Sequence, residues 1–170
     1  MLGNVPVSGA DAPASPPVPA NCGAAEHHQF DFWLGSWTVT ENGQPAGRNR
    51  IEPVLGGCAL LESWSGTSGT QGHSLSFYDA SRKKWHQTWV DSQGGVLYLD
   101  GALVDGVMTL EGIRPDAATG RDFRERIRWS VVGEGIVRQV WDRAPLPAGA
   151  WEPVFDGRYE RAAAGAQGSP

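Results

Sequence analysis

A strict alternation of large and polar residues from Trp85 to Asp91 constrains the fold more than any other stretch of the chain. Segments with turn-forming residues lie on both sides of it. Such a period-two pattern is typical of a half-buried strand, which places Trp85, Gln87, Trp89 and Asp91 on one face. This face mixes indoles with an amide and a carboxylate, and a buried polar group without a partner costs about 1–3 kcal/mol. The polar groups therefore either satisfy one another or face a small wet cavity.

Length, charge and cysteine number exclude several classes of protein. A chain of 170 residues fits one domain with a substantial core. Its formal net charge of −5 argues against general binding to nucleic acids or anionic membranes, because both require a dominant basic patch. No apolar run approaches the roughly 20 residues of a membrane-spanning helix. Two distant cysteines do not suggest a zinc site, and we expect no metal and no cofactor.

The two cysteines, Cys22 and Cys58, bear on the cellular compartment. They could form one disulfide in an oxidising compartment, and they would stay free in the cytosol. Both lie next to a glycine at the edge of a predicted element, which favours the disulfide. The first residues lack the basic region and apolar core of a signal peptide, but their Ala/Pro-rich composition resembles what remains after signal cleavage. We therefore expect a periplasmic or secreted protein, with no signal peptide in this chain.

Strands and turns alternate along most of the chain. Residues 1–25 are predicted to be a disordered Ala/Pro-rich lead, residues 26–162 a β-barrel domain, and residues 163–170 a disordered tail. Residues 26–34 predict one or two helical turns, and a loop is expected at 114–120. Ten strands are predicted, at residues 36–40, 48–54, 58–64, 73–78, 85–91, 96–100, 107–112, 124–132, 136–142 and 154–161.

The lack of helical periodicity after Gly35 decides the architecture. Without a helix to cross over, consecutive strands must be antiparallel neighbours. A meander of this size has two exposed edges, and closing into a barrel removes both. We predict an all-β, antiparallel up-and-down barrel of about nine to ten strands with a short N-terminal helix. A barrel of this size encloses a cavity for one small ligand. A two-sheet sandwich is the alternative.

Several segments resemble a known group of barrels. Leu34-Gly35-Ser36-Trp37 matches the opening signature of the calycin superfamily, which contains the lipocalin-like and fatty-acid-binding-like barrels. Residues 22–161 resemble a bacterial family of lipocalin-like, often exported proteins. The resemblance implies a calycin-like barrel and an exported location, and it implies no particular activity. The segments that carry it are 30–37, 57–64, 84–91, 137–141 and 155–159.

The strand faces locate a candidate pocket. Within their strands, Glu62 shares a face with Trp64, and Gln139 shares a face with Trp141. Together with the face that contains Trp89, these residues suit an apolar or aromatic molecule with one or two polar handles. The alternative is a core filled by the tryptophans, with the three polar side chains bonded to each other. The predicted ligand-binding residues are Glu62, Trp64, Gln87, Trp89, Asp91, Gln139 and Trp141.

Arginines and histidines on the strands are assigned mainly to the outer face. Arg124, Arg126 and Arg128 alternate with apolar residues that favour the interior, so they should face solvent. An interior arginine that grips a carboxylate, as in the fatty-acid-binding proteins, is the less favoured alternative. His86 should also lie on the solvent side. His73 could lie at the barrel rim, which leaves open a haem-binding barrel with one histidine ligand.

Two classes of function follow from this pattern. The favoured one is binding or transport of a small apolar or aromatic molecule in the barrel cavity. The alternative is a small-molecule enzyme, such as an isomerase, cyclase or hydrolase. There, Glu62 or Asp91, made more basic by an apolar setting, would move a proton on the substrate. The sequence contains no recognisable catalytic motif.

Overall fold

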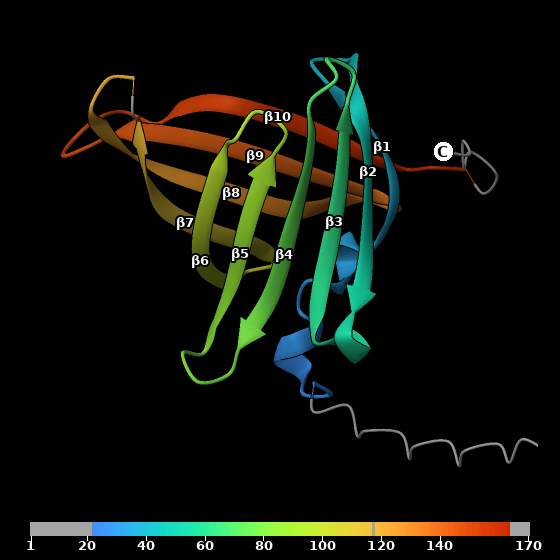
Figure 1. Ribbon diagram of the computed structural model, residues 1–170. Helices are drawn as coiled ribbons and strands as arrows, with labels where there is room; N and C mark the ends of the chain where they lie inside the picture. Colours follow the sequence, from blue (N-terminus) through green and yellow to red (C-terminus); the bar gives the residue numbers. More distant parts are fainter. Residues whose placement is uncertain (1–21, 117, 164–170) are drawn as a thin grey trace, which may run out of the picture.

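The chain forms a closed antiparallel β-barrel of ten strands in a computed structural model, which describes residues 22–116 and 118–163 (Figure 1). Each strand pairs with the next, and β1 pairs with β10 to close the barrel. The predicted all-β, up-and-down barrel is therefore confirmed. The strands are β1 Gly35–Glu41, β2 Gln44–Val54, β3 Ala59–Gly66, β4 Gln71–Asp79, β5 Lys84–Asp91, β6 Val96–Val104, β7 Val107–Asp116, β8 Arg121–Gly133, β9 Ile136–Pro145 and β10 Glu152–Arg161.

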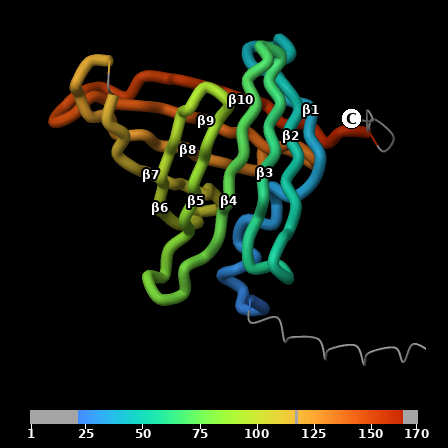
Figure 2. Tube along the Cα trace, in the orientation of Figure 1, coloured from blue at the N-terminus to red at the C-terminus, as the bar shows by residue number. Residues whose placement is uncertain are grey.

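The chain path is a simple meander. Figure 2 follows it from the blue N-terminal segment through successive neighbouring strands to the red last strand, which lies beside the first. The inward-facing residues alternate with exposed ones, as in β1, where Trp37 and Val39 are buried and the residues between them face outward. This alternation places one apolar face of every strand in a common interior.

The strands are longer than the sequence predicted, and β7 shows the consequence. Arg114 was expected in a loop at 114–120, but β7 continues to Asp116. The pairing of β6 with β7 ends at Glu111, whereas β8 pairs with β7 as far as Asp116. Pro115 therefore lies on a segment with only one neighbouring strand, where a residue without an N–H is tolerated. The predicted loop was therefore wrong for its first three residues, which belong to β7.

Two short 3-10 helices, η1 Ala25–His28 and η2 Asp31–Trp33, close the lower end of the barrel in Figure 1. They confirm the predicted helical turns. Phe30 and Trp33 are fully buried, and the Phe30 ring centroid lies 5.0 Å from that of Trp33, 5.6 Å from that of Trp85 and 5.1 Å from that of Trp129. The indole N–H of Trp85 donates to Gln29 Oε1 at 3.1 Å. This end of the barrel is thus packed with aromatic rings.

A disulfide joins Cys22 to Cys58 and confirms the predicted pairing. It connects the segment before η1 to the connection between β2 and β3, which contains the short helix η3 Leu55–Gly57. Most of the predicted disordered lead at 1–25 and tail at 163–170 lies outside the described residues. In the part of the chain that the structure describes, no helix is long and apolar enough to cross a membrane.

Candidate functional site

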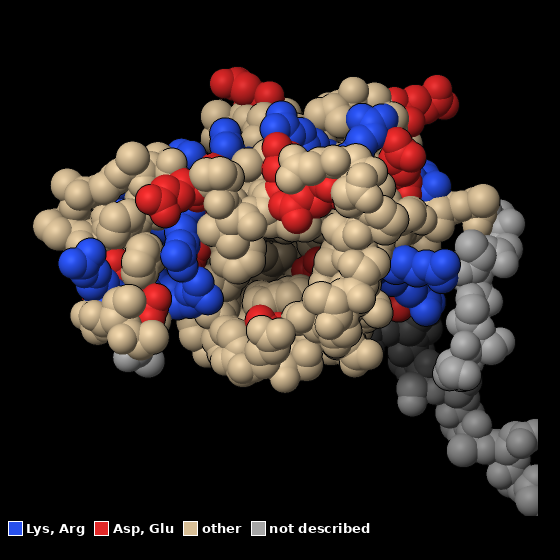
Figure 3. Space-filling model, turned by 90° about the horizontal axis from the view of Figure 1, so that it is seen from above, with Lys and Arg blue, Asp and Glu red and all other residues tan. Residues whose placement is uncertain are grey.

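A cavity of about 250 Å³ occupies the barrel above the packed aromatic end. Figure 3, seen from above, shows the molecule hollowed at its centre. The cavity is larger than the roughly 150 Å³ that admits a benzene ring, so one small ring system can enter. Its lining residues come from six strands and one loop: Glu62, Trp64, Thr70, Gln87, Trp89, Asp91, Leu97, Ile127, Trp129, Gln139, Trp141, Val154, Phe155 and Tyr159.

All seven residues that the sequence singled out lie on this lining, although they come from three strands that are not all neighbours. Whether they bind a ligand stays a prediction. The interior is solidly filled only at the end of the barrel closed by η1 and η2, where Trp85 is 1% exposed. Trp64, Trp89 and Trp141 are only partly buried. Trp85 therefore fills the packed end, these three tryptophans border the cavity, and the buried Trp129 lies between the two, packed against Phe30 and also on the lining.

Aromatic side chains make up much of the lining. Trp64 and Phe155 meet edge to face, with ring centroids 6.1 Å apart. Two indole N–H groups donate to carboxylates: Trp89 to Asp91 Oδ2 at 3.4 Å, and Trp141 to Glu125 Oε2 at 2.7 Å. Such bonds hold the rings in fixed orientations, which favours a preformed binding surface.

Glu62 is a nearly buried carboxyl on this lining, with 5% of the residue exposed. Asn49 Nδ2 donates to Oε1 at 2.7 Å, and Ser74 Oγ donates to Oε2 at 2.6 Å. Among the described residues, no arginine, lysine or histidine forms an ion pair with it. Burial raises the pKa of Glu62 above its ordinary value, and the hydrogen bonds from Ser74 and Asn49, together with the charge of His73, offset only part of this effect.

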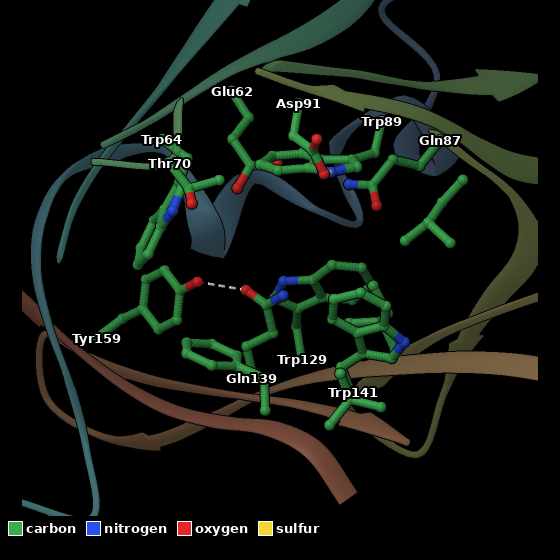
Figure 4. A pocket seen from close by; sticks show the side chains of 14 residues that line it. Glu62, Trp64, Thr70, Gln87, Trp89, Asp91, Trp129, Gln139, Trp141 and Tyr159 are labelled. Atoms are coloured by element: carbon green, nitrogen blue, oxygen red, sulfur yellow. Dashed lines mark hydrogen bonds between the residues drawn. The ribbon is translucent and has the colours of Figure 1, made fainter. Parts of the chain in front are cut away.

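The two glutamines of the lining are bonded to residues that the sequence did not select. Gln87 Nε2 donates to Ser74 Oγ at 3.3 Å and to Ser76 Oγ at 3.0 Å. Gln139 Oε1 accepts a bond from the hydroxyl of Tyr159, drawn as the dashed line in Figure 4. Burial raises the pKa of Tyr159 well above 10, and the nearby Glu62 carboxyl adds to this effect, so the phenol remains a donor. The bonds among Glu62, Gln87 and Gln139 that the filled-core alternative required are not formed.

Asp91 differs from Glu62 in its surroundings. Its Oδ1 atom accepts bonds from the backbone N–H groups of Gln93, at 2.9 Å, and Gly95, at 2.8 Å. Burial acts to raise the pKa of Asp91, but these bonds, with the Trp89 N–H and the charge of Arg114, hold it below its ordinary value. Asp91 therefore stays ionised and stabilises the turn between β5 and β6.

An ion pair that was not predicted from the sequence joins Arg114 to Glu125 beside the cavity. Glu125 is fully buried, and its Oε1 accepts a bond from Arg114 Nε at 2.9 Å. The Arg114 guanidinium also lies 5.9 Å from the Trp141 ring centroid. A signal for Glu125 existed, since it is in phase with the inward-facing Ile127 and Trp129. Arg114 could not be found because its segment was assigned to a loop.

Three arginines of β8 and β9 form ion pairs on the outer face of the barrel. Arg126 and Arg128 donate to Asp142 Oδ2 at 3.1 and 2.8 Å, and Arg138 pairs with Asp156. The guanidinium of Arg124 lies over the ring of Trp151, which places it outside the cavity lining.

The histidines of β4 and β5 also face outward. His86 bonds to Asp100 Oδ1 at 2.8 Å and to Thr88 Oγ1 at 2.9 Å. Arg82 donates to the same Asp100, so this network connects the β4–β5 turn to β6. His73 is exposed and bonds to Ser63 and to the Glu62 carbonyl. The suggestion that His73 could lie at the rim as a haem ligand was therefore wrong: its side chain lies on the outer face of β4.

The chain matches no protein-family model and no curated protein. The closed antiparallel barrel of ten strands is compatible with a calycin-like fold.

Proposed function

We propose that the barrel binds or transports a small apolar or aromatic molecule in its cavity. The observation that supports this function is the ring of aromatic side chains around a hollow that is packed at one end. Burying an apolar ligand against aromatic side chains is energetically favourable, and a few polar groups among these side chains orient the ligand. The proposed contacts are Glu62, Trp64, Gln87, Trp89, Asp91, Gln139 and Trp141.

We also propose that the protein is an exported, lipocalin-like protein of bacterial type. The disulfide between Cys22 and Cys58 supports a periplasmic or secreted location, because disulfides persist mainly in oxidising compartments. The closed up-and-down barrel supports the lipocalin-like assignment. Cell fractionation with thiol labelling tests the location: the protein should be found outside the cytoplasm with both thiols oxidised. A cytoplasmic, fully reduced protein would contradict it.

The binding function is tested by titrating the purified protein with 1-naphthylmethanol, a neutral bicyclic alcohol. Tryptophan fluorescence should change saturably, because several indoles line the cavity. Native mass spectrometry of freshly purified protein should in addition show a co-purified small molecule. If no neutral, cationic or anionic naphthyl compound binds at millimolar concentration, the proposed function is wrong.

One observation favours the enzyme alternative. The raised pKa of Glu62, caused by burial, is the property expected of a general acid or base next to a bound substrate. Asp91, whose pKa is lowered, fits this role less well. Glu62→Gln separates the two functions. In a carrier the substitution alters affinity only, whereas in an enzyme the variant still binds substrate but loses turnover.

A further inference from the structure

We infer that the ligand of this cavity is an organic cation, namely a protonated amine on a small aromatic or apolar frame, held by the Glu62 carboxylate, the Gln87 carbonyl and the surrounding rings. The inference rests on the proposed function and specifies the charge of the ligand. Three observations lead to it independently: the charges of the lining residues, the direction of their hydrogen bonds, and the number of aromatic rings.

The charged groups on the lining are all acidic. Of its fourteen residues, Glu62 and Asp91 are acidic and none is a lysine, arginine or histidine. In Figure 3, red acidic atoms lie inside the central hollow and around its edge. The bonds that Glu62 accepts come from the neutral side chains of Asn49 and Ser74. A carboxylate in a nearly buried position is stabilised by an opposite charge, and the residues that line the described cavity supply none; only the charge of His73, on the outer face of β4, is known to act on Glu62.

The hydrogen bonds also leave acceptors facing the cavity. When Glu62 is ionised, the single hydroxyl hydrogen of Ser74 is donated to it, so Ser74 can only accept from Gln87. Gln87 must therefore use its NH₂ group for Ser74 and Ser76, which leaves its carbonyl oxygen for a ligand. In Figure 4 this oxygen points into the cavity, as does the carboxyl of Glu62. An ammonium group has several N–H donors and no acceptor, so it can donate to both the Gln87 carbonyl and the Glu62 carboxylate.

The aromatic lining favours the same charge. In Figure 4 the side chain of Glu62 lies between those of Trp64 and Trp89. Tyr159 also borders the cavity. Cations are attracted to the faces of such rings, and tryptophan is the best of them. Trp129, Trp141 and Phe155 complete the aromatic surface. Rings with a carboxylate among them form a site in which both components attract a cation.

An anionic ligand lacks a partner at this site. Arg114 is a guanidinium beside the lining, and it is already bonded to the buried Glu125. Its charge also acts on Asp91, so two carboxylates share it. A ligand carboxylate would have to compete with both. The charge of Arg114 is therefore already balanced by carboxylates of the protein, so Arg114 is not free to bind a ligand carboxylate as the interior arginine of a fatty-acid-binding protein does.

Three probes of nearly equal shape test the inference: 1-naphthylmethylammonium, 1-naphthylmethanol and 1-naphthoate, each titrated at neutral pH by fluorescence and calorimetry. The ammonium should bind about tenfold or more tightly than the alcohol, as expected for a charged hydrogen bond, and the carboxylate should bind most weakly. Glu62→Gln should remove this preference for the ammonium and change alcohol affinity by less than about threefold. Glu111→Gln, an exposed site on β7, removes the same charge and should leave the ranking unchanged.

The outcomes separate the inference from the proposed function. If the alcohol binds as tightly as the ammonium, or if the preference survives in Glu62→Gln, the cation inference is overturned while ligand binding stands. If none of the three probes binds, the proposed function fails, and the inference fails with it. Should Glu62→Gln not fold, the ranking of the three probes with the unmodified protein still decides, because tighter binding of the alcohol or the carboxylate overturns the inference.

Discussion

The indole of Trp89 crosses Gly72 on the neighbouring strand so closely that a Cβ atom at residue 72 would lie 2.2 Å from the ring carbons Cη2 and Cζ2. The same relationship recurs at Gly47, where a Cβ would lie 2.7 Å from Trp64 Cη2. Real Cβ atoms do not approach other atoms so closely. Two cavity-lining tryptophans thus owe their positions to a missing side chain on the adjacent strand.

Gly72→Ala should displace the Trp89 ring, because the added methyl group occupies its place. Such overpacking costs about 1–3 kcal/mol of stability, and we expect weaker binding of 1-naphthylmethanol as well. Urea unfolding and the fluorescence titration measure the two effects. Gly23→Ala is the matched control, since a Cβ there meets nothing within 4 Å. Unchanged affinity and stability in Gly72→Ala would show that Trp89 does not depend on this contact.

Trp85 and Trp89 share one strand face, but they should respond differently to truncation. Trp85 is 1% exposed in the packed end, so Trp85→Ala should destabilise the fold by about 3–5 kcal/mol. Trp89 lines the cavity and is only partly buried, so Trp89→Ala should cost less stability and about 2 kcal/mol or more of ligand affinity. Equal losses of stability, with affinity for naphthyl probes retained in Trp89→Ala, would instead support a filling role for both residues.

Glu62 should make the free protein less stable as the pH rises from acid. Its pKa in the folded state lies above the ordinary value of 4.5, so folding favours the protonated form. The stabilising effect of that proton is complete below pH 4.5 and is lost as the pH rises through the raised pKa. Urea unfolding at a series of pH values should therefore show this loss in the unmodified protein. In Glu62→Gln this pH-dependent loss of unfolding free energy should be absent. If the unfolding free energies of the two proteins instead change in parallel with pH, the loss does not come from Glu62.

The disulfide should contribute strongly to stability. Cys22 and Cys58 are 36 residues apart, and the chain-entropy relation gives about 4 kcal/mol for a loop of that length. The loop closed by the disulfide includes η1 and η2, so loss of the disulfide should also loosen the packed end of the barrel. Replacing both cysteines with serine and measuring urea unfolding tests this. The reduced, unmodified protein is the control, and it should lose a similar amount. A loss below about 1 kcal/mol would show that packing of Phe30 and Trp33 alone holds the segment.

Much of the fold could be predicted because its signals are local. Alternation along the segment from Trp85 to Asp91, and turn residues between such segments, determine strands and their faces without knowledge of neighbours. A meander without helical crossovers then leaves few architectures other than a barrel. The same local rule placed all seven predicted residues on the inner face. It did not place Arg114, whose segment was assigned to a loop. The strand continues there because β8 pairs with β7 as far as Asp116, and Pro115 is tolerated because β6 no longer pairs with it.

By itself, therefore, the sequence determined which side chains face the interior of this protein. Only the tertiary structure decided what each of them does there. Phe30 and Trp33 pack into one end of the barrel, so Trp85 fills that end while Trp89 borders a cavity. Strand register then gives Glu62 its bonds to the neutral side chains of Asn49 and Ser74. The physical reason is that alternation along a strand specifies a face, whereas depth along the barrel and cross-strand neighbours depend on how all ten strands close around one segment.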